Sequence, residues 1–354
     1  DFFMTQSHAA TSSLSVSIDQ TDRKRRTKTR LALPLLAALA LILCVTLFVA
    51  VRAGWFTRPE LPVAVVPLEW PEEPNATSST RNRAQTSGLP QAPDPRLIEI
   101  IPEGFLPARA ADGTTPLSVY ARPAATVLES KTPVPTVAII MRRAGIGQLV
   151  TSEAMLRLPL EISFALSPYA SEVDRQAIEI REEGHELFLD LPIAAARSPI
   201  DDPGPKALSS SLNEQDNHAR LRWSLTRFPG YAGLLGHVGG DGVVPAPVRA
   251  LIVKEVEGRG LGLIETGQTS SEMDRANFFR APVRLSIEND LSSEAFDAAL
   301  SQLESIAQKN GSALGVANIS PLAIERIKHW SSKLSEKGLR LVPASALLTR
   351  EPRS

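Results

Sequence analysis

The feature that most constrains this chain is a regular alternation of short apolar runs and longer amphipathic segments, which begins at residue 136. The apolar runs are rich in Val, Ile and Leu and have the lengths of buried strands. We predict strands at 136–141, 161–166, 186–193, 231–237, 261–265, 282–287, 312–317 and 339–342. Helical patterns lie between most of them, at 171–183, 213–227, 245–258, 293–310 and 321–337.

Glycines mark the ends of several of these segments. Each stands three or fewer residues before a predicted strand, where a helix commonly stops in a left-handed residue; they are Gly184, Gly230, Gly260, Gly311 and Gly338. Alternating strands and helices predict a mainly parallel sheet with helices outside, either barrel-like or doubly wound. In both architectures ligands bind beyond the carboxyl ends of the strands.

Two adjacent arginines occupy such a position. The stretch "VAIIMRRAGIG" begins as a buried strand and ends in Arg142 and Arg143 before a glycine turn. Asp190, His237 and Glu265 stand at or near the ends of other predicted strands. The arginines are either an anion clamp, for a uronate, a phosphate or a partner's carboxylate, or a solvated strand end paired with Glu265 or Asp190.

Composition excludes several classes of function. The net charge of −1 gives no general attraction to nucleic acid. Cys44 is the only cysteine, so neither an intramolecular disulfide nor a cysteine metal site can form, and the five histidines are scattered. Val150 stands where a dinucleotide fingerprint needs its third glycine, and no nucleophile elbow is present. We predict that His185, beside Gly184, caps a helix or lies at the surface.

The N-terminal part has a different character. Residues 22–30, "DRKRRTKTR", carry six basic side chains and one acid, and the 21 residues of 31–51 carry no charge. At about 1.5 Å per residue this run spans roughly the 30 Å core of a bilayer, although a buried soluble helix is the alternative. The positive-inside rule predicts a cytoplasmic arm at 1–30, a transmembrane helix at 31–51 and a proline-rich periplasmic linker at 52–95.

Several segments resemble, in order and spacing, the divergent polysaccharide deacetylase family of bacterial envelopes. The most distinctive are "DDPGPKAL", "LRWSLTRFPGYAG" and "GLRLVPASAL", within a similarity that covers roughly residues 97–348. The resemblance implies a distorted (β/α) barrel of the polysaccharide deacetylase or glycoside hydrolase type over 96–350. It also implies an envelope location and a role in carbohydrate metabolism, which agree with the single-pass inner-membrane anchor predicted from residues 22–51.

The resemblance implies a metal site that this sequence has altered. Related deacetylases use an aspartate pair as base and metal ligand, with histidines completing the site and a late histidine assisting the leaving group. Here the aspartate pair falls at Arg142 and Arg143, a strand-end histidine near Asp190 and an asparagine–histidine pair at Gly236–His237. The strand-five acid falls at Glu265, and the late glycine–histidine–proline at 317–319, which has no proton donor.

The charge reversal decides against the parent chemistry. Unit charges about 4 Å apart interact by about 4 kcal/mol at an effective dielectric near 20, and arginine neither ligates a cation nor acts as a base. We therefore expect no catalytic residue, no cofactor and a cleft that binds an envelope glycan or a periplasmic or membrane protein. The alternatives are a hydrolase rebuilt around Asp190, His237 and Glu265 with zinc or another divalent ion, and a purely structural envelope tether.

Overall fold

The structure is a computed structural model that describes residues 88–124, 134–194, 203–238, 245–267, 278–288 and 291–349. Chain contacts divide the protein into residues 1–72 and 73–354, and every described residue lies in the second unit. The predicted cytoplasmic arm, the transmembrane helix and most of the linker lie outside the described residues. Within the described ranges no helix is long and apolar enough to span a bilayer.

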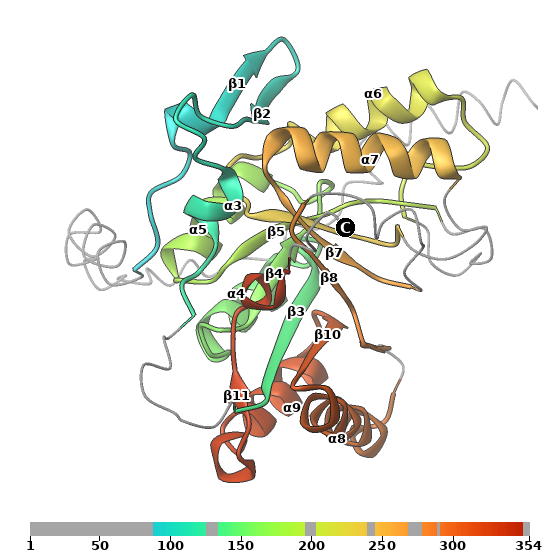
Figure 1. The fold of residues 1–354 in the computed structure, drawn as a ribbon. Helices are drawn as coiled ribbons and strands as arrows, with labels where there is room; N and C mark the ends of the chain where they lie inside the picture. Colours follow the sequence, from blue (N-terminus) through green and yellow to red (C-terminus); the bar gives the residue numbers. More distant parts are fainter. Residues whose placement is uncertain are drawn as a thin grey trace, which may run out of the picture. The chain divides into compact units, whose positions relative to one another are not determined.

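A short lead-in precedes the main sheet. The 3-10 helix η1 (Pro95–Leu97) leads into an antiparallel hairpin of β1 (Ile98–Ile101) and β2 (Gly104–Pro107). The helix α3 (Pro116–Tyr120) follows, and a reciprocal capping box between Thr115 and Ser118 fixes its start. This segment lies beside the sheet in Figure 1.

The main sheet is parallel and forms a half-barrel, in the order β8-β7-β6-β5-β4-β3-β10-β9, with β11 paired to the start of β3. Its strands are β3 (Thr136–Ala144), β4 (Ser163–Leu166), β5 (Leu187–Asp190), β6 (Gly233–Gly236), β7 (Gly262–Glu265), β8 (Arg280–Pro282), β9 (Leu285–Ile287), β10 (Ser312–Asn318) and β11 (Arg340–Leu341). The predicted α/β class with a parallel sheet is confirmed, and the predicted barrel is confirmed as a half-barrel.

The predicted strand 282–287 links the two edges of this sheet. The structure divides it into β8, which pairs with β7, and β9, which pairs with β10. Between them the amide of Val283 donates to Glu265 O at 2.7 Å, and the amide of Arg284 donates to Leu314 O at 2.8 Å. This short segment therefore pairs with β7 at one end of the sheet and with β10 at the other.

Helices cover the outer face of the sheet (Figure 1). They are α4 (Gln148–Arg157), α5 (Val173–Glu182), α6 (Glu214–Leu225), α7 (Ala246–Arg259), α8 (Ser293–Asn310) and α9 (Pro321–Ser331), with the 3-10 helices η3 (Ser335–Lys337) and η4 (Ala344–Leu347) after them. The helix α4 was not predicted. The five glycines expected to end helices all have positive φ, from 68° at Gly338 to 96° at Gly184.

The core has two layers, which the strand alternation separates. On β3 the side chains of Val137, Ile139 and Met141 pack against the helices in the larger cluster of buried residues. Ala138 and Ile140 face the other way, into a smaller cluster enclosed by the curved sheet. Tyr120 of the lead-in helix belongs to this inner cluster, so the lead-in helps to fill the half-barrel.

Candidate functional site

The alternation along the strands determines which residues reach the open end of the half-barrel. The inner cluster contains Ile140, Phe188 and Leu235 as the last inward apolar residues of β3, β5 and β6. Two positions further on, the inner face carries Arg142, Asp190 and His237. We call this carboxyl end of the inner face the mouth. The structure therefore brings three of the five predicted site residues to the mouth.

Arg143 reaches the mouth by a different route. The pairing of β3 with β4 shifts between Met141 and Ala144, as in a β-bulge, and Arg143 has the left-handed φ of 59°. A non-glycine residue in this conformation is uncommon and is held only where its surroundings require it. Here the Arg143 amide donates to Asp190 Oδ2 at 3.0 Å, while its side chain is exposed.

Asp190 is the hub of this cluster. Asp190 is only 7% exposed. The guanidinium of Arg142 contacts both of its carboxylate oxygens, with Nη2 3.3 Å from Oδ1 and Nε 3.5 Å from Oδ2. Together with the Arg143 amide, these donors occupy the carboxylate. The Arg142 side chain remains 39% exposed, so this ion pair lies at the protein surface. The alternative in which the strand-end arginines pair with Asp190 is thus observed for Arg142.

His237 is half-buried beside this pair. Its Nδ1 lies 3.0 Å from Thr266 Oγ1. Burial, and secondarily the positive charge of Arg142, lower the pKa of the His237 imidazole below its usual value. The ring is therefore neutral near pH 7 and presents hydrogen-bonding nitrogens without adding charge. Arg142 and Arg143 against Asp190 leave one more positive than negative charge at the mouth.

Glu265 lies on the other face of the sheet. In β7, Leu263 belongs to the outer cluster and Ile264 to the inner one, so Glu265 follows Leu263 toward the helices. It is 1% exposed and forms an ion pair with Arg280, whose Nη1 lies 3.6 Å from its Oε1. The structure does not bring Glu265 into the group formed by Arg142, Asp190 and His237.

Three further residues reach the mouth that the sequence did not single out as ligand-binding candidates. Ser167, Thr266 and Asn318 follow the inward residues Ala165, Ile264 and Val316 by two positions. Asn318 pairs in register with Arg142 across β10 and β3. Its Oδ1 is buried, and no described residue donates a hydrogen bond to it. Period-two counting from the last inward-facing apolar residue of each strand leads to all three.

A divalent metal does not fit this arrangement. The described residues contain no group of three His, Cys, Asp or Glu side chains that could hold one. Of the weak candidate set, Asp190 is occupied by Arg142 and Arg143, and Glu265 faces the opposite side of the sheet. That leaves His237 as one ligand beside a guanidinium, whereas a catalytic zinc site needs three protein ligands.

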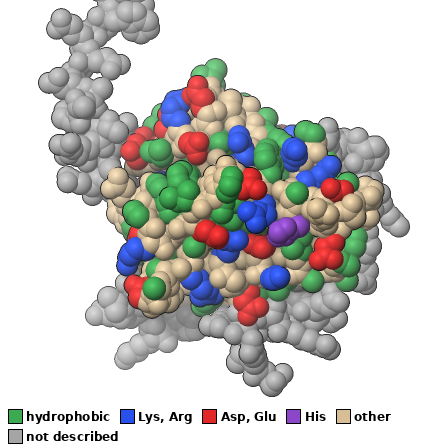
Figure 2. Space-filling model, turned by 90° about the horizontal axis from the view of Figure 1, so that it is seen from above, with side chains coloured by type: hydrophobic (Ala, Val, Ile, Leu, Met, Phe, Trp, Pro, Cys, Tyr) green, Lys and Arg blue, Asp and Glu red, His purple; other side chains and the backbone are tan. Residues whose placement is uncertain are grey.

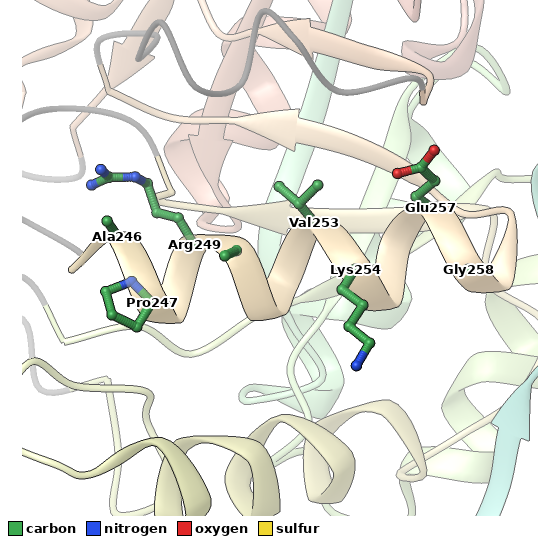
Figure 3. Close-up of a pocket in the computed structure, with 8 residues that line it drawn as sticks. Ala246, Pro247, Arg249, Val253, Lys254, Glu257 and Gly258 are labelled. Atoms are coloured by element: carbon green, nitrogen blue, oxygen red, sulfur yellow. The ribbon is translucent and has the colours of Figure 1, made fainter.

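One described cavity lies away from the mouth. A cavity of about 680 Å³ runs along α7, and all the described residues that line it belong to that helix. Figure 3 shows Arg249 and Glu257 on one side of α7 and Lys254 on the opposite side. The mouth is marked by its charged residues instead, Arg142, Arg143 and Asp190. Figure 2, which views the molecule from above, shows basic and acidic side chains interspersed with apolar ones over that face of the protein.

Comparisons with known proteins agree with the fold. A family model described as divergent polysaccharide deacetylase matches residues 139–348. A crystal structure of an uncharacterized protein from Agrobacterium tumefaciens C58 is 27% identical, with a TM-score of 0.61, and the match covers 69% of this chain and 99% of that one.

Other similarities are weaker. A putative polysaccharide deacetylase from Mycobacterium smegmatis is 11% identical with a TM-score of 0.42, covering 64% of this chain and 93% of its own. A CE4 family pseudoenzyme from Bacillus anthracis is 11% identical with a TM-score of 0.38, covering 61% and 66%. The comparison with curated proteins found no match.

Proposed function

Because this chain belongs to the divergent polysaccharide deacetylase family, we propose that it is a catalytically degenerate member that binds an acidic envelope glycan at the mouth. One observation carries the proposal: the guanidinium of Arg142 lies on the Asp190 carboxylate where the family resemblance leads one to expect a metal and its ligands. In this proposal the guanidinium of Arg142 supplies the positive charge that a metal ion would supply in an active relative.

The described residues at the mouth do not supply the groups that deacetylation requires. Deacetylation needs a Lewis acid on the amide carbonyl, a base for water and an acid for the leaving amine. Arg142 and Arg143 cannot be deprotonated in proteins. Asn318 offers no titratable proton, and a lone neutral His237 beside a guanidinium cannot replace the metal. We therefore propose that the mouth binds a glycan without cleaving its acetyl groups.

The same residues suit the recognition of an acidic sugar. The partly exposed guanidinium of Arg142 and the exposed side chain of Arg143 are planar cations that match a carboxylate. Asn318, directly opposite Arg142 in the strand pairing, adds a polar side chain beside them. Neutral His237 and Thr266 add further polar groups. A partner protein's carboxylate would use the arginines alone.

The proposed location follows from the sequence and the family. Residues 1–30 lie in the cytoplasm, 31–51 cross the inner membrane of a bacterium, and 52–95 hold the domain in the periplasm. A tether of this composition lets the mouth reach the cell-wall layer while the chain stays anchored. Protease protection of the basic arm in sealed spheroplasts, with digestion of the domain, is the expected result.

The test is binding by the full chain in detergent, measured by titration calorimetry. We expect oligoglucuronate to bind and a neutral chitin oligomer to bind much more weakly. Changing Arg142 and Arg143 to serine should weaken oligoglucuronate binding at least about tenfold, which corresponds to about 1.4 kcal/mol. The matched control is Arg96→Ser, which removes an exposed arginine from the lead-in and should leave binding unchanged.

Two results would redirect the proposal. Preference for an acidic peptide over oligoglucuronate, lost in the same variants, would make the ligand a protein. Acetate release from acetylated oligomers, abolished by His237→Ala, together with about one equivalent of bound zinc, would establish the rebuilt hydrolase instead. No loss of binding in the arginine variants would remove the mouth from the function.

A further inference from the structure

A groove on the outer surface carries features that binding at the mouth does not use. It lies between α4 and α5, has a volume of about 500 Å³ and is lined on the α4 side by Leu149, Ser152, Met155 and Leu156. Figure 1 shows these two helices next to each other outside the sheet. The groove is therefore a channel between neighbouring helices, the shape that accepts a third helix.

The α4 wall exposes large apolar side chains in a line. Leu149 is 88% exposed and Leu156 is 64% exposed. Seven residues apart, they share one face of the helix at a separation of about 10.5 Å along its axis. Ile146 before the helix and Leu160 after it are also exposed. Single exposed apolar residues are ordinary, but several gathered around one helix mark an interaction surface.

The α5 wall is acidic. Three glutamates line it, Glu179, Glu182 and Glu183, against one base, Arg175. Arg175 pairs with Glu179 and also with Glu172 outside the groove, whereas Glu182 has no ion-pair partner among the described residues. An apolar row facing an acidic row is complementary to a helix with one apolar face and basic flanking residues.

The floor of the groove is held in place. The amide of Gly145 donates to Thr151 Oγ1 at 2.9 Å, and the Gln176 side chain of α5 donates to Ser171 O at 2.5 Å and Gly145 O at 3.5 Å. A Cβ at Gly145 would come within 2.5 Å of the Ala170 Cβ, so turn and helix pack closely. A preformed groove loses little entropy when a partner docks.

We propose that the α4–α5 groove docks a basic amphipathic helix of another protein, with two apolar side chains about two turns apart against Leu149 and Leu156. The acidic wall favours this occupant over the alternatives. An anionic membrane surface would be repelled by the glutamates. A second copy related by a two-fold axis would bring two acidic walls into one isologous interface.

The test uses the full chain in detergent and a fluorescent helical peptide of about 14 residues built from leucine and lysine, followed by anisotropy. A leucine–glutamate peptide of identical pattern is the charge control. We expect saturable binding of the lysine peptide, no binding of the glutamate peptide, and weakening as salt rises from about 0.05 to about 0.3 M. Binding of both peptides alike, or of neither, would overturn the proposal.

Matched variants locate the binding. Changing Leu149 and Leu156 to serine should weaken the lysine peptide at least about tenfold, and Glu182→Lys several-fold, whereas Ile178→Ser, an exposed apolar residue of α5 that does not line the groove, should have no effect. Glu336→Lys is the matched charge control. Equal weakening by the controls would refute the groove as the site. A concentration-dependent dimer that is lost in the leucine variants would show that the groove binds a second copy of the chain. Flotation of the protein with anionic vesicles would show that it binds a membrane.

Discussion

Glu186 offers the sharpest test of how the closed end of the half-barrel is held. Its side chain is fully buried at the start of β5, where Oε1 accepts from the Arg122 amide at 2.9 Å. Oε2 accepts from Ser163 Oγ at 2.8 Å and from the Ser345 amide at 3.1 Å. One carboxylate thus connects the lead-in, β4 and the C-terminal segment. Glu186→Ala would leave these three donors without their acceptor.

The expected cost can be worked from these contacts. Each donor left without a partner costs about 1 kcal/mol, and the emptied side-chain volume at this buried position adds about 1 kcal/mol. Relief of the desolvation of a buried carboxylate returns about 1 kcal/mol. The net loss in free energy of unfolding is about 3 kcal/mol, a fall in melting temperature of roughly 6–12 °C for a domain of this size.

The assay is thermal unfolding of the full chain, followed by circular dichroism, with Glu182→Ala as the control because that glutamate lies on α5 at the surface. Burial raises the pKa of the Glu186 carboxyl above its usual range despite the hydrogen bonds. The folded state therefore binds the proton more tightly than the unfolded state does. The contribution of Glu186 to the free energy of unfolding is thus greatest below the pKa of the unfolded state and is lost as pH rises through the pKa of the folded state. The difference in free energy of unfolding between wild type and Glu186→Ala should therefore become smaller as pH rises through the folded-state pKa. A variant within about 0.5 kcal/mol of wild type, or a widening gap, would refute the reasoning.

Two further predictions concern the mouth and the turn behind it. Proton NMR should find the His237 pKa below the usual histidine value, rising in Arg142→Ser but staying depressed because burial is the larger cause; no change would show that the guanidinium does not act on the ring. Gly145→Ala should cost about 3 kcal/mol in chemical denaturation, since φ is +85° and the new Cβ would lie 2.5 Å from Ala170 Cβ and 2.7 Å from Leu166 Cδ1. Gly113→Ala, with φ of +86° and nothing within 4 Å, should cost about 1 kcal/mol and serves as the control; equal costs would remove the steric argument.

The sequence predicted the repeating elements well because each carries a local signal. Apolar runs located β3 to β7 and β10, and Gly260 and Gly311 cap α7 and α8 with positive φ as predicted. The predicted helix 321–337 instead ends at Ser331, and Gly338 caps the 3-10 helix η3. The helix α4 was not predicted because its exposed face is also apolar, with Leu149 and Leu156 pointing outward. Its sequence therefore lacks an amphipathic pattern. The division of 282–287 into β8 and β9 depends on pairing with distant strands, which no local pattern contains.

Site residues were predictable only in part, because strand ends fix a level in the sheet but not a face. Arg142, Asp190 and His237 have the inward parity, whereas Glu265 is one position out of phase and pairs with Arg280. His185 was expected to cap a helix or lie at the surface. It is fully buried, with Nε2 2.9 Å from Met155 O near the end of α4 and Nδ1 2.9 Å from Ile162 O. The capping contact is observed and the surface position is wrong, since both ring nitrogens find carbonyl partners inside the protein.

The inward parity of Arg142 places its guanidinium where the sheet can accommodate the charge. A guanidinium at this position would be costly if it were buried alone, but Asp190 sits two strands away on the same inner face and neutralises it. The bulge at Arg143 turns its amide toward the same carboxylate while leaving its side chain in solvent. The donors of Arg142 and Arg143 thus satisfy both oxygens of the Asp190 carboxylate. The ion pair that stabilises these strand ends is therefore supplied by the chain itself.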